Sequence, residues 1–306
     1  MNWSQVAAYL GLLAVGACLL MIAGEFDLSI GSMIGFAGMM VALPSIYFHW
    51  PISLAILFAF VMSMLLGALN GYLVMRTRLP SFIVTLAFLF ILRGLTLALS
   101  IMFADRTIIS GVGDLPQADP IANTLFHGVA FHGVFTWLAH MGIGKPLVPG
   151  IPKVIIWWLV LAAIGAFVLA KTRYGNWILA VGGDANAAKN VGVPVKRVKI
   201  SLFVLTAFCS CLFAVLQVSD IGSAAADRGL QKEFEADHRG RDRRHAADGR
   251  LWLSGRRMLR RVDLRRRADR HHLYERELRL VRFLGVMLLI AVLFNHYVRR
   301  RVSQAQ

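Results

Sequence analysis

The chain has 306 residues, of which 57% are hydrophobic, with a mean hydropathy of +0.62 and a formal net charge of +16. This composition excludes an ordinary soluble enzyme and favours a protein that crosses a membrane several times. The charge is concentrated, because sixteen arginines and only six acidic residues lie between Arg239 and Arg282. The charge that remains elsewhere is ordinary for a membrane protein with basic cytoplasmic loops.

Seven apolar runs are candidate membrane-spanning helices, which need about 20 mostly apolar residues. They are Gln5–Ala23, Leu28–Ile46, Ile52–Met75, Phe82–Phe103, Val154–Ala170, Ile200–Val218 and Phe283–Val298. The first run has no basic segment before it and no small-residue cleavage site, so it does not predict a signal peptide. The second is rich in small residues such as Gly31 and Ser32, which suit close helix packing or a broken helix beside a path.

Lysine and arginine predict the orientation, because they accumulate in cytoplasmic loops. We expect three basic places to be cytoplasmic: Arg76 with Arg78, the set Lys171, Arg173, Lys189, Lys196, Arg197 and Lys199, and Arg299–Arg301. The loop from Ala104 to Lys153 has few basic residues, so we expect it outside. Counting back places the amino terminus outside, and we therefore expect that a preceding helix is missing from this sequence.

Two charged residues lie within or between the apolar runs. Asp27 separates the first two, where it either acts as an acid near the membrane or caps the helix that follows; capping is favoured. Arg93 lies inside the fourth run with no acidic residue nearby in sequence. We expect it to form an ion pair inside the bundle or a polar contact along a path.

No catalytic residues and no metal site are predicted. Cys18, Cys209 and Cys211 lie in apolar runs, where cysteine behaves as a small buried hydrophobe. His127, His132 and His140 lie in the expected outer loop without a cysteine or carboxylate at ligand spacing, so we expect a wet surface loop there.

Three stretches together resemble permease subunits of sugar ABC importers of the ribose/xylose type. They are "GEFDLSIGSMIGFAGM" (Gly24–Met39), "LNGYLVMRTRLPSFIVTLAFLFILRGLTLALS" (Leu69–Ser100) and "TRYGNWILAVGGDANAAKNVGVPVKRVKISLFVLTAF" (Thr172–Phe208). The resemblance implies an all-α, polytopic membrane helix bundle with short or broken helices. It places eight residues at the translocation path or in bundle packing: Asp27, Ser29, Gly31, Ser32, Asn70, Gly71, Thr85 and Arg93.

The resemblance also implies a function and partners. The family imports monosaccharides or related polyols across the bacterial inner membrane, with an ATP-binding subunit, a periplasmic sugar-binding protein and a second permease copy. We expect no cofactor in this chain, since ATP is bound by the partner subunit, and no nucleic-acid partner. The competing class is a channel or ion-coupled carrier that needs no ATPase.

The third stretch predicts a short surface helix. Gly182 and Gly183 break the chain, Asp184 caps a helix from Ala185 to Asn190, and Gly192 with Pro194 ends it. A phosphate loop is excluded, because the Gly-Lys-Ser/Thr ending is absent. By resemblance this is the segment that couples the permease to its ATPase, through these residues: Gly182, Gly183, Asp184, Asn186, Ala187, Ala188, Asn190 and Gly192.

The resemblance stops at Ala236, before the arginine-rich segment. Plausible codons for His238–Leu253, taken one base later, encode Ile-Ala-Ala-Val-Ile-Gly-Gly-Thr-Leu-Leu-Thr-Gly-Gly-Tyr-Gly, which is similar to the apolar block of the family. A frameshift from about Asp237 to Phe283 therefore explains the arginines as CGN codons in the wrong frame. We expect a permease domain over residues 1–236, a disordered, non-native segment over 237–282, and a last helix with a cytoplasmic tail over 283–306. The chain as written is then expected to be defective.

The rival hypothesis is a membrane-anchored protein with a basic arm that binds nucleic acid or anionic lipid. Its composition fits, but the predicted topology places the preceding run, Ile200–Val218, with its end outside. A basic arm there would oppose the tendency of positive charge to stay inside, and it would meet no nucleic acid.

Overall fold

The computed structural model describes residues 3–77, 79–113, 115, 119–130 and 150–226. The predictions for Arg78, His132, His140, the arginine-rich segment and the last apolar run lie outside these residues. In the described part, six helices are long and apolar enough to cross a membrane. They are α1 (Trp3–Ile22), α2 (Ile30–Tyr47), α3 (Ile52–Thr77), α4 (Ser81–Ala104), α8 (Lys153–Lys171) and α11 (Val195–Ile221).

These helices confirm the expected all-α bundle and the first six predicted spans. Most ends agree within two residues, but α11 begins at Val195, five residues before the expected start. Pro194 directly precedes it, and proline is tolerated at a helix start because the first N–H groups have no partner within the helix. The first turns of α11 are therefore polar and basic, which apolar-run counting does not detect.

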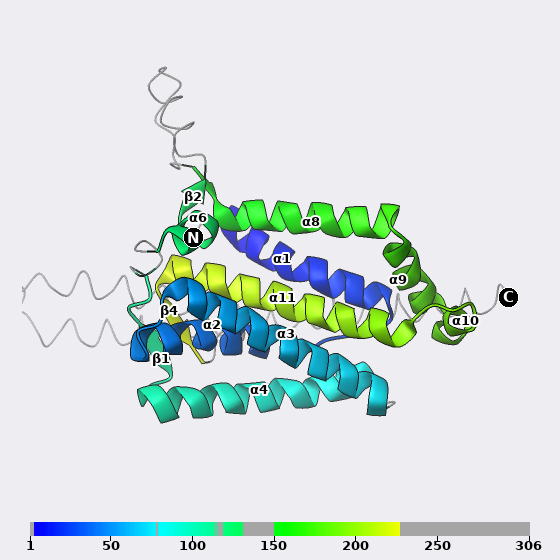
Figure 1. Ribbon diagram of the computed structural model, residues 1–306, viewed down its shortest axis with the longest axis horizontal. Helices are drawn as coiled ribbons and strands as arrows, with labels where there is room; N and C mark the ends of the chain where they lie inside the picture. Colours follow the sequence, from blue (N-terminus) through cyan, green and yellow to red (C-terminus); the bar gives the residue numbers. More distant parts are fainter. Residues whose placement is uncertain (1–2, 78, 114, 116–118, 131–149, 227–306) are drawn as a thin grey trace, which may run out of the picture. The chain divides into compact units, whose positions relative to one another are not determined.

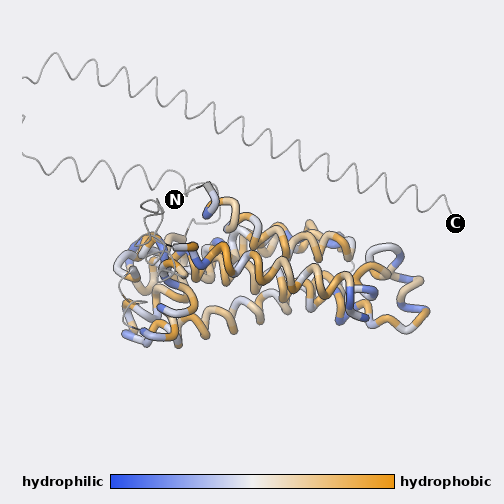
Figure 2. Tube along the Cα trace, turned by 90° about the horizontal axis from the view of Figure 1, so that it is seen from above, coloured by the Kyte–Doolittle hydropathy of each residue, from blue (hydrophilic) through white to orange (hydrophobic). Residues whose placement is uncertain are grey.

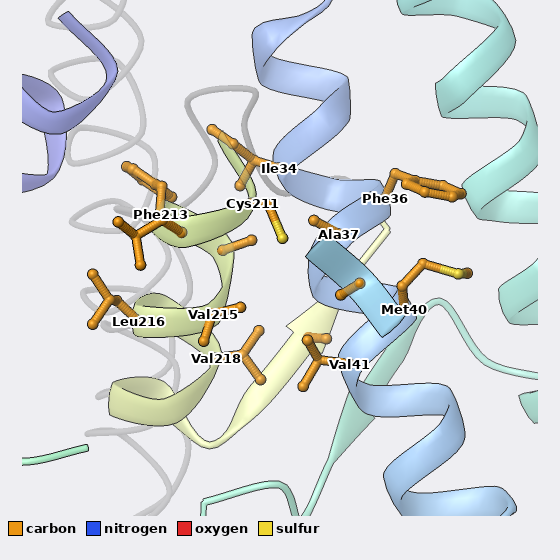
Figure 3. Close-up of a cluster of buried hydrophobic side chains, with 14 of the residues drawn as sticks. Ile34, Phe36, Ala37, Met40, Val41, Cys211, Phe213, Val215, Leu216 and Val218 are labelled. Atoms are coloured by element: carbon orange, nitrogen blue, oxygen red, sulfur yellow. The ribbon is translucent and has the colours of Figure 1, made fainter. Parts of the chain in front are cut away.

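Helix α2 lies at the centre of the bundle, packed against α3, α4 and α11 (Figure 1). Inside this bundle 78% of α2 is buried, whereas only 17% of α8 is, so α8 leaves most of its apolar surface for lipid. Figure 3 shows side chains of α2 and α11 between the two helices, with Val41 beside Val218 and Cys211 near Ala37. Close packing of this kind joins helices in lipid, where the hydrophobic effect does not.

Helices α3 and α11 cross closely at two glycines of α3. A Cβ atom on Gly67 would lie 2.6 Å from the Cβ of Ala207. A Cβ on Gly71 would lie 3.0 Å from the Cα of Ile200. The missing Cβ atoms at both positions let the two backbones approach this far, and the contact at Gly67 is the tighter of the two.

The ends of the bundle differ in character. Figure 1 places α9 (Arg173–Gly183), α10 (Ala185–Asn190) and the carboxyl end of α3 at one end, with β1 and α6 at the other. Figure 2 shows hydrophobic residues along the helices and hydrophilic residues gathered towards their ends. The first end carries Arg76 and the basic residues between Lys171 and Lys199, which were expected in the cytoplasm, and we name it the basic end.

The expected plain loop between Ala104 and Lys153 contains short elements, which corrects the sequence analysis. Strand β1 (Ile108–Ser110) pairs antiparallel with β4 (Ser223–Ala225), which follows α11. Two further strands, β2 (Val129–Ala130) and β3 (Ile151–Pro152), pair with each other. Helix α6 (Pro120–Phe126) is capped by Asp119, whose carboxylate accepts from the Ile121 N–H at 3.0 Å.

The cysteines divide between two environments. Cys209 and Cys211 are buried in α11, as expected. Cys18 is exposed on α1, so its expected burial is wrong. An apolar run does not specify which side of a helix faces the bundle, because lipid accepts apolar side chains as readily as the core does.

Candidate functional site

The segment between α1 and α2, residues 23–29, carries a group of polar contacts at the basic end; we name it the α1–α2 connection. Within it, the Asp27 carboxylate accepts from the backbone N–H of Ser29 at 2.8 Å and from the Ser29 hydroxyl. Its other oxygen accepts from the Thr206 hydroxyl of α11 at 3.0 Å. Asp27 thus organises the start of α2 and also fastens the connection to α11.

The helix that Asp27 precedes begins at Ile30, two residues later than expected, and Ser29 holds its N-cap position. The predicted capping by Asp27 is therefore wrong, because its carboxylate binds the N–H of Ser29 and no N–H inside the helix. The carboxylate receives the Ser29 N–H just before that helix, where a negative charge is also favoured by the helix dipole. Burial raises the pKa of Asp27 above its ordinary value, while the hydrogen bonds from Ser29 and Thr206 act to lower it.

Neighbouring helices satisfy the backbone of the same connection. The Ser81 hydroxyl of α4 accepts from Phe26 N–H at 3.0 Å, and the Thr85 hydroxyl accepts from Leu28 N–H at 3.2 Å. These side chains replace the helical hydrogen bonds that the non-helical segment lacks. A buried irregular backbone needs such partners, because an unpaired polar group in a dry site is costly.

Helix α3 adds an amide to this cluster. Asn70 Nδ2 donates to the Ser29 hydroxyl at 3.2 Å, and both residues are buried. The Asn70 Oδ1 atom has no hydrogen-bond partner in the described part of the chain. Ser32, one turn into α2, donates its hydroxyl to the Ser29 carbonyl at 2.9 Å. Asn70 therefore leaves one buried acceptor available to a polar group.

Of the eight predicted path or packing residues, five come together in this cluster: Asp27, Ser29, Ser32, Asn70 and Thr85. Gly71 instead packs against α11, and Gly31 is half-buried near the start of α2. Arg93 is half-buried in the middle of α4, and no ion pair or hydrogen bond of Arg93 is found among the described residues. Its role stays a prediction.

Four residues of this cluster were not predicted as site residues from the sequence: Thr206, Ser81, Glu25 and Lys199. The ammonium of Lys199, in α11, contacts the Glu25 carboxylate, and the two side chains are 12% and 11% exposed respectively. Thr206 could have been noticed in the sequence, because it places a hydroxyl group inside an apolar run. Glu25 and Lys199 are 174 positions apart, so local sequence could not pair them.

The segment between α8 and α11 forms two helices, where one was expected. Helix α9 runs through Gly182 and ends at Gly183, so the two glycines do not break the chain before Asp184. Helix α10 has the predicted bounds, and the Asp184 cap is confirmed: its carboxylate accepts from Asn186 N–H at 2.7 Å and from Ala187 N–H at 3.1 Å.

The predicted end of α10 is also confirmed. Gly192 has φ = +87°, its N–H donates to the Lys189 carbonyl at 3.1 Å, and Val193 N–H donates to the Ala188 carbonyl at 3.0 Å. This pair of bonds is a Schellman motif, which favours glycine because the backbone there is left-handed.

The exposed face of α10 differs from the expected one. Ala188 is only 4% exposed and packs inward, so it cannot present a docking surface. Asn186, Ala187 and Asn190 are exposed. Val191, directly after the helix, is 79% exposed and was not singled out from the sequence. The outward surface is thus formed by small and polar side chains beside one prominent apolar residue.

A family profile described as "Branched-chain amino acid transport system / permease component" matches residues 1–236. The chain belongs to this permease family. The match ends one residue before Asp237, where the sequence changes to its arginine-rich composition. With the six apolar helices, membership makes the chain a multi-pass permease of the inner membrane.

Curated relatives of this permease include transporters named for sugars. The chain is 28% identical over 269 residues to the xylose transport system permease protein XylH of Escherichia coli, covering 77% of this chain and 68% of the relative. It is 29% identical over 226 residues to the ribose import permease protein RbsC of Haemophilus influenzae, covering 74% and 62%. No solved structure matches the chain.

Proposed function

We propose that this permease is the transmembrane subunit of an ABC importer that carries a monosaccharide or a related polyol inward. The names of the relatives, xylose and ribose permeases, support the class of substrate. The observation that carries the coupling part of the proposal is α10, a short helix capped at both ends, with an outward surface at the basic end. A preformed surface helix suits docking into a groove of another protein.

The proposed partners occupy opposite ends of the permease. An ATP-binding subunit receives α10 through Ala187 and Val191, which are exposed, while Ala188 supports the helix from inside. A periplasmic sugar-binding protein delivers substrate at the other end, and a second permease copy completes the path. ATP is bound by the partner subunit, this chain performs no covalent chemistry, and no nucleic acid takes part.

The proposed mechanism is alternating access. ATP binding and hydrolysis move α10, and the spanning helices repack around a central path. A ligand shifts such an equilibrium only if its free energy differs between the two states. The cluster of Asp27, Ser29, Asn70 and Thr85 is suited to change partners, because Asn70 Oδ1 is a buried acceptor with no partner in the described residues.

We also propose that residues 237–282 are encoded in a shifted frame and that the chain as written is defective in transport. The end of the family match at residue 236 supports this proposal. Sixteen arginines in a permease segment have no counterpart in the other loops, where basic residues occur singly or in short groups.

The rival functional class for the permease, a channel or ion-coupled carrier, would need no ATPase.

Co-purification separates these classes. The full chain and a frame-repaired version are each expressed with a candidate ATP-binding subunit from the same genome, and the tagged permease is isolated. We expect the ATP-binding subunit to be recovered, and the frame-repaired complex to hydrolyse ATP faster when the binding protein and its sugar are added. Failure of both permease versions to recover the subunit would rule out the ABC assignment.

A further inference from the structure

The α1–α2 connection touches every helix that surrounds the start of α2. Asp27 contacts Thr206 and Glu25 contacts Lys199, both in α11; the Phe26 and Leu28 N–H groups donate to α4; and Ser29 accepts from Asn70 of α3. The Lys199–Glu25 contact is the one ion pair between side chains in the part of the chain that the structure describes. A shift of this segment therefore alters the partners of α2 at several points together.

Helix α9 lies directly on the beginning of this connection. A Cβ atom on Gly182 would collide with the carbonyl oxygen of Ile22, the last residue of α1, and would lie 3.4 Å from the Ala23 Cα. Both neighbours are backbone atoms, which cannot move aside as a flexible side chain does. The adjacent Gly183 has open space, with nothing within 4 Å of a Cβ. The contact is therefore specific to one of two consecutive glycines.

Only Asp184 separates α9 from α10. Its N–H completes the last turn of α9 by donating to the Ala180 carbonyl at 3.2 Å, while its carboxylate caps α10. Two consecutive hydrogen-bonded turns, one ending α9 and one beginning α10, therefore connect Gly182 to the proposed docking surface. A displacement of α10 reaches the Ile22 carbonyl without crossing a flexible loop.

We propose that the α1–α2 connection is the joint that transmits movement of α10 to the buried helix α2. Gly182 and the Lys199–Glu25 ion pair are its positioning residues. The proposal rests on the proposed function, because it takes α10 as the point that the ATP-binding subunit moves. Well-packed interfaces switch between discrete arrangements and do not deform smoothly, so a small shift at Gly182 is passed to α2 as a change of partners around Asp27.

The competing route runs from α10 through residues 191–194 into α11 alone. That route contains Gly192 in a left-handed turn, and it does not involve Gly182. Substitutions at Gly182 and Gly183, the two consecutive glycines at the end of α9, therefore distinguish the routes. Alanine at either position raises helix propensity by a similar amount, so the difference between the two variants isolates the contact with Ile22.

The test is amide hydrogen exchange on the full 306-residue chain in lipid nanodiscs. We expect Gly182→Ala to accelerate exchange over residues 27–35, which Gly182 does not touch, by about threefold or more. Gly183→Ala is the matched control and should leave these rates unchanged. Equal rates in parent and Gly182→Ala, or equal acceleration by both variants, would overturn the proposal.

A second pair of variants tests the proposal in the event that Gly182→Ala does not fold. Lys199→Met removes the ion pair, whereas Lys196→Met removes an exposed lysine from the same end of α11. Only Lys199→Met should accelerate exchange over residues 27–35, and Lys199→Arg should restore the parent rate. Acceleration by Lys196→Met alone, or by neither, contradicts the proposed joint.

The last arm uses the frame-repaired chain with its ATP-binding subunit. Gly182→Ala should still recover the subunit but should transport less sugar per ATP hydrolysed, while Gly183→Ala transports as the parent does. An unchanged ratio in Gly182→Ala overturns the joint. If the parent recovers no subunit, the proposed function fails, and the exchange measurement alone decides whether the connection joins α9 to α2.

Discussion

Asp27 shows how one carboxylate combines two roles. It organises the start of α2 through Ser29, and it accepts a hydrogen bond from the hydroxyl of Thr206, 179 positions away in sequence. An aspartate that only forms a turn before a helix would need only the first contact. The second contact places the charge inside the bundle, where desolvation raises its pKa.

This raised pKa predicts a specific dependence of stability on pH. The folded state holds the proton more tightly than the unfolded state, so the contribution of Asp27 to stability is fully present below its ordinary pKa. That contribution is lost as the pH rises through the raised value. Thermal unfolding of the chain in detergent from pH 4 upwards should therefore show a fall in melting temperature over this window, and Asp27→Asn should flatten it.

A second substitution controls for the general effect of changing the site. Thr206→Val removes one donor to the carboxylate but keeps the titrating group, so it should raise the pKa further and move the fall to higher pH. A fall of the same size and position in the parent and Asp27→Asn would show that another group causes it.

Among the elements, α10 owes its bounds to local capping and its orientation to packing. Asp184 and Gly192 define its two ends through backbone hydrogen bonds. Ala188 fixes its rotation by packing inward with residues of α9 and α11. Consequently the two consecutive alanines of this helix have opposite environments.

This difference gives a prediction for two neighbouring substitutions. Ala187→Glu should abolish binding of the ATP-binding subunit while the permease still inserts and elutes as a single species. Ala188→Glu should instead destabilise the permease itself by several kcal/mol, because it buries an unpaired charge. Co-purification and thermal unfolding distinguish the two outcomes. Normal binding by Ala187→Glu would place the docking surface elsewhere.

The crossing of α3 with α11 depends on small residues. Alanine in place of glycine favours a helix by about 1 kcal/mol, whereas overpacking a close contact costs about 1 to 3 kcal/mol. At Gly67 the contact with Ala207 would be 2.6 Å, so the cost should exceed the gain. Gly94 of α4 has nothing within 4 Å of a Cβ, so only the gain applies there.

We therefore predict that Gly67→Ala lowers the thermal stability of the permease, whereas Gly94→Ala leaves it unchanged or raises it. Thermal unfolding in one detergent should show a lower melting temperature for Gly67→Ala and an equal or higher one for Gly94→Ala. Equal effects at the two positions would mean that the two backbones do not approach as closely as the structure shows.

We expect the segment after residue 236 to determine whether the chain transports, because its sequence differs in composition from the rest of the permease. A charged side chain near the centre of a bilayer costs about 2.5 to 3.5 kcal/mol on insertion scales. Sixteen arginines and six acids between Arg239 and Arg282 therefore oppose any spanning helix there. We therefore expect the chain as written to form an incomplete translocation path.

We predict that the sequence as written does not import sugar and that the frame-repaired sequence does. Resequencing the locus distinguishes an error in the sequence from a lesion in the gene. Both versions are then expressed with the partner subunits in a host without its own importer, and uptake of labelled xylose and ribose is measured. Equal uptake by the two versions would overturn the frameshift proposal and assign the arginines a function of their own.

The spanning helices of the described residues and the bounds of α10 could be predicted from the amino-acid sequence alone. Length, hydropathy and capping are local properties, and Asp184 and Gly192 act within a few residues of themselves. The prediction that Gly182 and Gly183 break the chain was wrong, because α9 continues through Gly183. Lysine and arginine predicted which connections lie at the same end of the bundle, because this rule depends on the composition of each connection and not on contacts between residues.

Which residues contact one another across the bundle could not be predicted without the three-dimensional structure. Ser29 and Asn70 are 41 positions apart, and Glu25 and Lys199 are 174 apart. Hydropathy does not separate a lipid-facing side chain from a core one, so neither the central place of α2 nor the exposure of Cys18 could be predicted. The rotation of each helix is set by packing and buried hydrogen bonds with its neighbours, and these depend on distances that a linear sequence does not contain.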